Sequence, residues 1–211
     1  MPTETTASRK TAEQLAAAKQ ELREHSRAAR RDRSARRLDE ASHQIAEHLM
    51  RLPQFEEARC ASVYVSRPTE PGTAPLLAAL SSRGTRVLLP MLGDGLQRGW
   101  GEYRDADDLI ERAPGRPPEP SSEFLPGGEL ERADVIVVPA LGVDFTGTRL
   151  GQGGGWYDRA LAQARPDALI VAAVFESEWF GGPEAALPRE AHDIPVHAAV
   201  TPRGLRLACA A

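Results

Sequence analysis

Residues 151–155 include four glycines and form the part of this sequence best suited to chemistry. Glycine permits backbone angles and close approaches that a side chain would block, so several main-chain N–H groups can converge on one anion. Arg149 precedes the glycines and Arg159 follows them, and the guanidinium group is suited to binding phosphate oxygens. Asp158 adds a carboxylate that could hold Mg²⁺. The segment therefore predicts a phosphate site next to a divalent cation.

The flanking residues place this segment between a strand and a helix. Residues 133–141 are apolar except for Asp134, as expected of a strand buried in a parallel sheet. Residues 156–164 place apolar side chains on one side at helical spacing, and a helix N-terminus favours negative charge. A Walker loop would need a lysine, and a dinucleotide fingerprint would need glycine in place of Trp156. The order of elements predicts a nucleotide site in an α/β domain.

The segment from Arg149 to Arg159, with the pattern Arg-Leu-Gly-x-Gly-Gly-Gly-Trp-Tyr-Asp-Arg, resembles the signature of the 5-formyltetrahydrofolate cyclo-ligases, also called 5,10-methenyltetrahydrofolate synthetases. The resemblance implies an enzyme that uses ATP as co-substrate and Mg²⁺ as cofactor to close 5-formyltetrahydrofolate to 5,10-methenyltetrahydrofolate. ADP and phosphate would be released, through phosphorylation of the formyl oxygen and attack by N10. The family often has tyrosine or arginine at position 152 and tyrosine at position 156, whereas this chain has Gln152 and Trp156.

A basic helix is predicted from Thr11, because Lys19, Arg23, Arg27 and Arg30 repeat at spacings of four, four and three. By spacing alone, the favoured interpretation is a solvated basic face, and binding of RNA or an acidic partner is an alternative. The order Lys-Gln-Glu-Leu-Arg from Lys19 to Arg23 is similar to an N-terminal element of the family. That resemblance implies that both cations contact ATP phosphates.

Two further segments are similar to the family. Glu70, in a loop after a predicted strand, stands three residues before Thr73, and the family pattern implies that this glutamate holds the folate. Val65, on that strand, corresponds to a position that touches substrate. Asp193 follows His192 near the end of the chain, and the match implies that Asp193 is the second Mg²⁺ carboxylate beside Asp158. From the sequence alone, these acidic residues would be ordinary loop residues.

The resemblance and the phosphate chemistry together give the predicted site. The catalytic cations are Arg149 and Lys19, and no residue is assigned as general base. The predicted ATP-binding residues are Lys19, Arg23, Arg149, Gly151, Gln152, Gly153, Gly154, Gly155, Trp156 and Tyr157. The predicted folate-binding residues are Val65, Glu70, Gly154, Gly155 and Trp156, and the predicted metal ligands are Asp158 and Asp193.

The remaining chain predicts a single three-layer, Rossmann-like α/β domain over residues 11–208, with a mostly parallel central sheet flanked by helices, after a disordered tail of residues 1–10. Helices are expected at residues 38–52 and 74–82, the second capped by Thr73. Strands are expected at residues 60–66, 85–90, 100–103, 168–175 and 196–200. Residues 91–130 are expected to cross the ligand-binding end of the sheet as a long excursion, starting with a loop at 91–99. Trp100 and Tyr103 are expected to be packed aromatics.

Composition limits the alternatives. The chain has 211 residues, a net charge of −4 and two cysteines, Cys60 and Cys209, without metal-ligand spacing. These features, with no long apolar run, predict a cytoplasmic protein with reduced thiols that binds neither nucleic acid nor membrane. A monomer is expected, although the sequence does not fix the oligomeric state. Two other functions stay open: another ATP-dependent phosphoryl-transfer enzyme with the same glycine-rich cradle, or a non-catalytic relative that binds RNA or protein through its basic helix.

Overall fold

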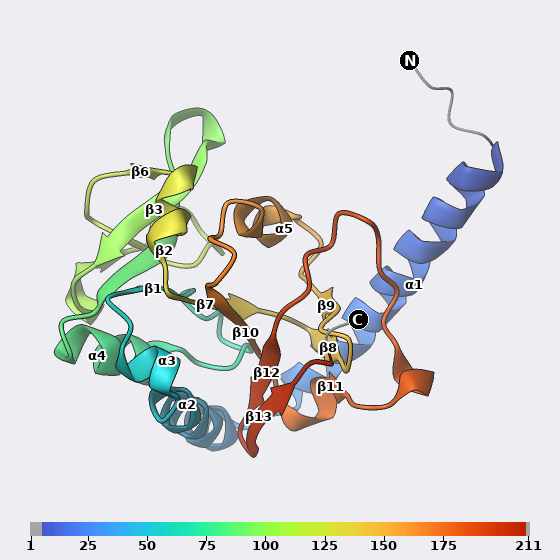
Figure 1. Cartoon of the computed structure of the whole chain (residues 1–211), viewed down its shortest axis with the longest axis horizontal. Helices are drawn as coiled ribbons and strands as arrows, with labels where there is room; N and C mark the ends of the chain where they lie inside the picture. Colours follow the sequence, from blue (N-terminus) through green and yellow to red (C-terminus); the bar gives the residue numbers. More distant parts are fainter. Residues whose placement is uncertain (1–5, 210–211) are drawn as a thin grey trace.

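The computed structural model describes residues 6–209, without the side chains of residues 6–12 and of Leu96. An eight-stranded sheet of these residues forms the middle of the molecule, in the order β13-β12-β10-β7-β1-β2-β3-β6 (Figure 1). Its parallel strands are β1 (Cys60–Ser62), β2 (Arg86–Leu92), β7 (Val135–Pro139), β10 (Leu169–Ala173) and β12 (Ala198–Thr201). The antiparallel edge strands are β3 (Arg98–Tyr103), β6 (Leu125–Pro126) and β13 (Gly204–Leu207). The prediction of a mostly parallel sheet flanked by helices is confirmed.

Helices cover both faces of the sheet. Side chains alternate along a strand, so each strand contributes residues to the core on either face. On one face, Val135 and Val137 of β7 are fully buried in a core with α2 (Ala35–Met50), α3 (Pro53–Glu56) and α4 (Ala74–Ser82). On the other face, Ile136 and Val138 are fully buried near the turn η3 (Gly127–Arg132) and α5 (Trp156–Leu161). One short strand thus contributes to two cores, which is why its sequence is apolar without interruption.

The predicted β-α-β unit is present, since β1 and β2 are parallel and α4 connects them. Two details differ. The first strand ends at Ser62 instead of residue 66, although the Val63 amide still donates to the Leu88 carbonyl at 3.0 Å. Thr73 does not cap α4 with its side chain. Its hydroxyl instead donates to the carbonyl of Tyr64 at 2.6 Å, which closes the loop after β1.

The expected loop at residues 91–99 is a hairpin, and the prediction was wrong there. Strand β2 continues to Leu92, which pairs with Arg98 at the start of β3. Gly95, with a φ of 62°, lies in the turn η1 (Asp94–Leu96) that joins them. Only residues 93–97 form the turn, and the paired strands extend into both sides of the segment that was expected to be a loop. The excursion then returns through the short strands β4 (Leu109–Ile110) and β5 (Glu119–Pro120), which pair with each other.

The long helix α1 (Thr6–Arg31) and a small second sheet lie to one side of the main sheet (Figure 1). The small sheet consists of β8 (Gly142–Asp144), β9 (Arg149–Leu150) and β11 (Trp179–Phe180), and the sequence did not predict it. Helix α1 begins at Thr6, within the segment 1–10 that was expected to be a disordered tail, and that expectation stays a prediction; residues 1–5 lie outside the described residues.

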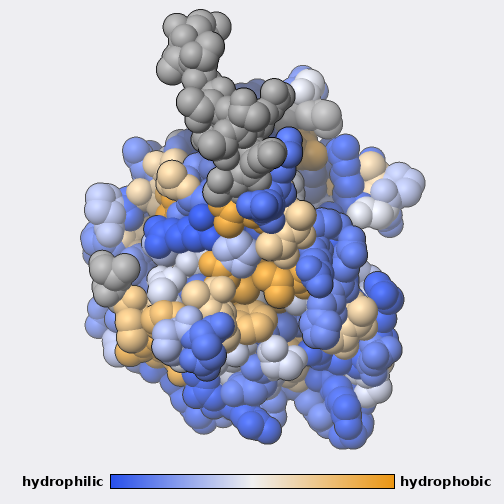
Figure 2. All heavy atoms as spheres, turned by 90° about the vertical axis from the view of Figure 1, so that its right-hand side faces the viewer, coloured by the Kyte–Doolittle hydropathy of each residue, from blue (hydrophilic) through white to orange (hydrophobic). Residues whose placement is uncertain are grey.

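Figure 2 shows this side of the molecule, where hydrophilic residues surround hydrophobic ones that gather near the middle of the view. No helix within the described residues is both long enough and apolar enough to span a membrane.

Candidate active site

A cavity of about 440 Å³ opens at the carboxyl ends of β1, β2 and β7. The chain leaves β1 toward β2 on one side, while β7 lies on its other side, and open α/β sheets bind ligands at such a change of direction. Every residue that the sequence assigned to the site lines this cavity. These residues are Lys19, Arg23, Val65, Glu70, Arg149, Gly151, Gln152, Gly153, Gly154, Gly155, Trp156, Tyr157, Asp158 and Asp193.

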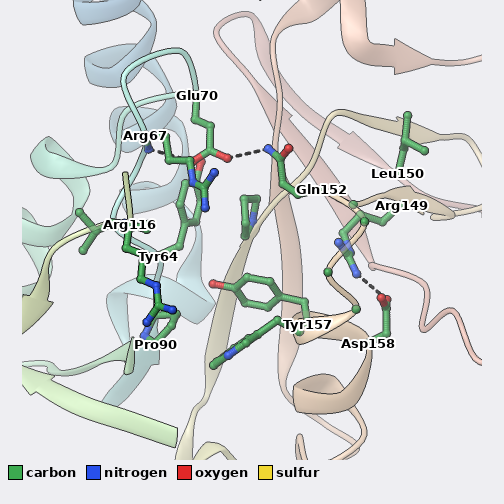
Figure 3. Close-up of a pocket in the computed structure, with 18 of the residues that line it drawn as sticks. Tyr64, Arg67, Glu70, Pro90, Arg116, Arg149, Leu150, Gln152, Tyr157 and Asp158 are labelled. Carbon is green, nitrogen blue, oxygen red and sulfur yellow. Dashed lines mark hydrogen bonds and ion pairs between the residues drawn. The ribbon is translucent and has the colours of Figure 1, made fainter. Parts of the chain in front are cut away.

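The cavity has two ends, which Figure 3 shows as opposite walls. We call the part formed by α1 and residues 149–158 the glycine-loop end. We call the part formed by Tyr64, Arg67, Pro90, Met91 and Arg116 the arginine end.

The glycine loop adopts a backbone conformation that few other residues permit. Gly153 has a φ of 100° and Gly155 a φ of 58°, both in the left-handed region. At Gly151 the φ is ordinary, but a Cβ there would lie 2.5 Å from Nη1 of Arg149. The loop leads into α5, which has only six residues. We therefore attribute its suitability for phosphate to the loop amides more than to a helix dipole.

Arg149 lies beneath this loop and is buried, with 8% of its surface exposed. Its Nη2 donates to Oδ1 of Asp158, and the guanidinium carbon lies 6.0 Å from the centre of the Tyr157 ring. The buried Nε has no hydrogen-bond partner among the described residues. A buried donor without a partner is costly, so this end of the cavity is suited to an anionic ligand.

A second ion-pair cluster faces the same end. Nζ of Lys19 lies 2.7 Å from Oε2 of Glu190 and 2.6 Å from Oδ2 of Asp193. Burial opposes the charged form of Lys19, but the hydrogen bonds to Asp193 and Glu190 outweigh it and raise the pKa of the lysine. Burial likewise opposes the charged form of Asp193, yet the bond from Lys19 lowers the pKa of that carboxyl. Both groups are therefore ionised at neutral pH.

The acidic members of this cluster have the chemistry of a cation site. Ligand atoms of Glu190, His192 and Asp193 lie within 4.8 Å of one another. Asp193 was predicted as a metal ligand, and His192 was noted only as its neighbour in the family pattern. Glu190 was not among the predicted site residues. Asp158, the other predicted ligand, is not a member of this compact group.

Helix α1 is fastened to the glycine loop by its basic residues. Nε of Arg23 donates to the Gly151 carbonyl at 2.9 Å, and Nη2 of Arg27 donates to the Gln152 carbonyl at 2.9 Å. Nε2 of Gln152 in turn donates to Oε1 of Glu70 at 2.8 Å. This chain of hydrogen bonds joins α1, the glycine loop and the loop after β1.

The same helix is anchored at its far end by a buried ion pair. Arg30, 1% exposed, donates to both carboxylate oxygens of Glu178 at 2.9 and 2.8 Å. The guanidinium of Arg33 lies 4.0 Å from the centre of the Phe175 ring. The favoured prediction of a solvated basic face was therefore wrong for Lys19 and Arg30. Spacing places residues on one face of a helix, but it does not show what that face contacts.

The arginine end combines apolar surface with two cations that the sequence reasoning missed. Arg67 lies in the loop after β1, at a strand's carboxyl end, so its position was a usable signal. Arg116 lies in the proline-rich excursion and carried no such signal. Trp100 and Tyr103 lie outside this cavity and are packed, as predicted, with 1% and 8% of their surfaces exposed.

A parallel sheet covered on both faces, with a glycine loop and buried cations at the carboxyl ends of its strands, defines a Rossmann-like α/β enzyme. The sequence model of the 5-formyltetrahydrofolate cyclo-ligase family matches residues 15–202, and the chain belongs to this family.

Individual relatives agree. The chain is 38% identical to a 5-formyltetrahydrofolate cyclo-ligase of Mycolicibacterium smegmatis, over 69% of this chain and 74% of the relative. It is 30% identical to the cyclo-ligase of Escherichia coli, over 82% of this chain and 94% of the relative. Its fold matches the solution structure of the Aquifex aeolicus 5,10-methenyltetrahydrofolate synthetase with a TM-score of 0.76 and 28% identity, over 92% and 94% of the two chains.

Proposed function

We propose that this enzyme closes 5-formyltetrahydrofolate to 5,10-methenyltetrahydrofolate and consumes ATP, releasing ADP and phosphate. The names of the relatives support the folate reaction. The main structural support is that the glycine loop and three buried or half-buried cations (Lys19, Arg23 and Arg149) meet in one cavity with an apolar wall. One end suits a polyphosphate, and the other suits a flat aromatic substrate.

The reaction has a chemical need for phosphorylation. A formamide at N5 is a poor electrophile, and its oxygen is a poor leaving group. Transfer of the γ-phosphoryl group to the formyl oxygen turns that oxygen into a phosphate and leaves an iminium-like carbon, which N10 attacks. Phosphate then departs with the former formyl oxygen. The protein contributes mainly by positioning the two substrates and neutralising charge.

In this proposal, Arg149 and the loop amides stabilise the phosphoryl group in transfer. The guanidinium already lies against Gly151 and keeps one buried donor without a partner. Fixed donors that need no reorganisation usually give the largest catalytic effect. Lys19 and Arg23 would contact the outer phosphates, for which Lys19 must exchange its bonds to Glu190 and Asp193.

Asp158 and Asp193 would hold Mg²⁺. Their chemistry fits, because Mg²⁺ prefers carboxylate oxygens and both side chains line the cavity beside the phosphate-binding residues. Each is now paired with a cation of the chain, Arg149 for Asp158 and Lys19 for Asp193. When bound, the metal would supply positive charge to the phosphates. When Mg²⁺ takes the two carboxylates, Arg149 and Lys19 would turn from them to the phosphates. The positive charge of the metal and the two cations would then be balanced by the carboxylates and the phosphates.

Glu70 would hold the folate by accepting hydrogen bonds from its pterin ring. The carboxylate is buried and already accepts from Gln152 and from the Arg67 amide at 2.9 Å. A carboxylate has about four acceptor positions, so two remain for a ligand. Val65 and Trp156 would contact the ring through their apolar surfaces.

The decisive experiment mixes purified protein with 5-formyltetrahydrofolate, ATP and Mg²⁺ and follows the near-ultraviolet absorbance of the methenyl product. Asp158→Asn tests the metal assignment, and Asp167→Asn, an exposed carboxylate outside the cavity, is the matched control. We expect product only with ATP, a strong loss in Asp158→Asn and full activity in the control. Tight ATP binding without product would instead favour the alternative phosphoryl-transfer enzyme.

The alternative of RNA or protein binding through the basic helix has no specific support. Lys19, Arg23, Arg27 and Arg30 all bond to other parts of this chain.

A further inference from the structure

The two cations of the arginine end differ from the other cations that line the cavity. Lys19, Arg23 and Arg149 each donate to an acceptor of this chain. Within residues 13–95 and 97–209, whose side chains are described, no hydrogen bond or ion pair involves the guanidinium of Arg67 or Arg116. Both are exposed and face the cavity from the same wall (Figure 3). Their charge is therefore available to a ligand.

Arg67 is tied to the proposed pterin site through its backbone. Its amide donates to Oε2 of Glu70 at 2.9 Å, and the Glu70 amide donates back to the Arg67 carbonyl at 3.0 Å. Since Glu70 is buried, this pair of bonds fixes where the Arg67 side chain leaves the backbone. Its guanidinium reaches over the cavity while its backbone stays with the carboxylate.

Arg116 is carried by a wall that is itself anchored. Pro117 and Pro118 follow it and line the cavity, and proline restricts the backbone. Next in the chain, Glu119 is buried and accepts from the Leu92 amide at 3.2 Å, while Nε of Arg112 lies 3.3 Å from its other oxygen. The wall that presents Arg116 is thus fixed to the end of β2.

The rest of the arginine end is largely apolar. Tyr64, Pro90 and Met91 line the cavity there. An aromatic ligand could lie on this surface, but neutral rings give no reason for two cations. The glutamyl group at the end of a folate has two carboxylates and would explain both cations, because a guanidinium group binds a carboxylate through parallel N–H groups.

We propose that Arg67 and Arg116 form a carboxylate subsite that binds the glutamyl end of the folate substrate and so sets the direction in which the folate lies in the cavity. The inference rests on the proposed function, since it needs a folate in this cavity. It assigns the two ends of the cavity to different anions: phosphates to the glycine-loop end and carboxylates to the arginine end.

The test compares Arg67→Gln, Arg116→Gln and the double variant with the matched control Arg83→Gln, an exposed arginine that precedes β2 at the opposite end of the sheet. We expect the KM for 5-formyltetrahydrofolate to rise about 5-fold in each single variant, the upper range for exposed ion pairs, and further in the double variant. The KM for ATP and the kcat at saturation should stay unchanged. A rise in the KM for ATP, or no change in the KM for folate, would overturn the subsite.

A truncated substrate separates binding from structural damage. With the simple amide of 5-formyltetrahydropteroate, which lacks the glutamyl group and has no free carboxylate, the arginine variants should match the unaltered enzyme. An equal loss with both substrates would mean that the arginines act on structure, and the subsite would be wrong. Calorimetric titration of 5-formyltetrahydrofolate into the ATP-free protein and the same variants measures folate affinity directly. It tests the subsite even if no product forms, so failure of the subsite can be told apart from failure of the proposed reaction.

Discussion

The glycine-loop end and the arginine end of the cavity present positive charge in different ways. At the glycine-loop end, Lys19 and Arg149 are buried and paired with Asp193 and Asp158. At the arginine end, both guanidinium groups are exposed and have no partners among the side chains described, those of residues 13–95 and 97–209. A ligand at the glycine-loop end must replace hydrogen bonds that already exist within the chain. Its net affinity is therefore the difference between the bonds it forms and the bonds it breaks. A ligand at the second end adds bonds without breaking any, and it competes only with water.

The largest effect should come from the anchor of α1, on which the glycine-loop end depends. Glu178→Ala leaves the guanidinium of Arg30 buried without its carboxylate, and breaking a buried pair in this way costs about 3–5 kcal/mol. We expect that loss in the free energy of unfolding, measured with urea. Glu176→Ala, which removes a half-exposed partner of Arg206, is the control and should cost at most about 1 kcal/mol. Equal losses in the two variants would contradict the anchor.

Arg149→Ala should have the next largest effect and should act on catalysis. Removing a fixed donor from developing charge typically lowers kcat by about 10²–10³-fold. The control is Arg159→Ala in the same segment, whose exposed guanidinium contacts the Gly154 carbonyl at 3.0 Å, and it should change kcat only a few-fold. Steady-state rates at saturating folate decide the matter. Similar losses in both variants would show that the buried arginine has no special role.

Gln152→Ala should weaken the thermodynamic coupling between ATP binding and folate binding. Its amide links the glycine loop to Glu70, and a hydrogen bond of this kind contributes about 1 kcal/mol, or roughly 5-fold in an equilibrium constant. We expect folate to improve ATP affinity less in this variant than in the unaltered enzyme. Calorimetric ATP titrations with and without folate measure this, and Gln163→Ala, which does not line the cavity, is the control. Unchanged coupling would mean that the two ends bind independently.

The smallest effect concerns pH. The pKa of Asp193 lies below its ordinary value of 3.8, so its stabilising contribution is present above pH 3.8 and is lost as the pH falls through the lowered pKa. The pKa of Lys19 lies above 10.5, so its contribution is present below pH 10.5 and is lost as the pH rises through the raised pKa. The difference in Tm between the unaltered enzyme and Lys19→Met should therefore be flat across the neutral range. A slope near pH 7 would contradict these directions.

The sequence predicted the sheet and the glycine-loop end well, because each has a strong local signal. The apolar run before Pro139 has two buried faces, and the glycines at 153 and 155 have backbone angles that favour glycine. Every predicted site residue lines the cavity, although the roles of these residues stay predictions.

What the sequence did not show depends on contacts between distant segments. Arg30 and an exposed arginine on the same helix are indistinguishable by spacing, and only the position of Glu178 makes the first one buried. The strands of the small sheet have two or three residues each, too few for any periodicity. Arg116 lacks a signal for a similar reason, because its place at the cavity follows from the pairing of Glu119 with the end of β2.

The bond between Lys19 and Asp193 also has a consequence for synthesis on the ribosome. The two residues are 174 positions apart, and at the usual elongation rates about 10–35 s pass between their addition to the chain. Helix α1 is made before its acceptors, which are Ala140, Gly151, Gln152, Glu178, Glu190 and Asp193. Its cations must therefore wait in solvent, or with chaperones, while the sheet folds. The cavity is thus complete only once residue 193 has been made, and a nascent chain that stalls before residue 190 leaves Lys19 without its two carboxylate partners.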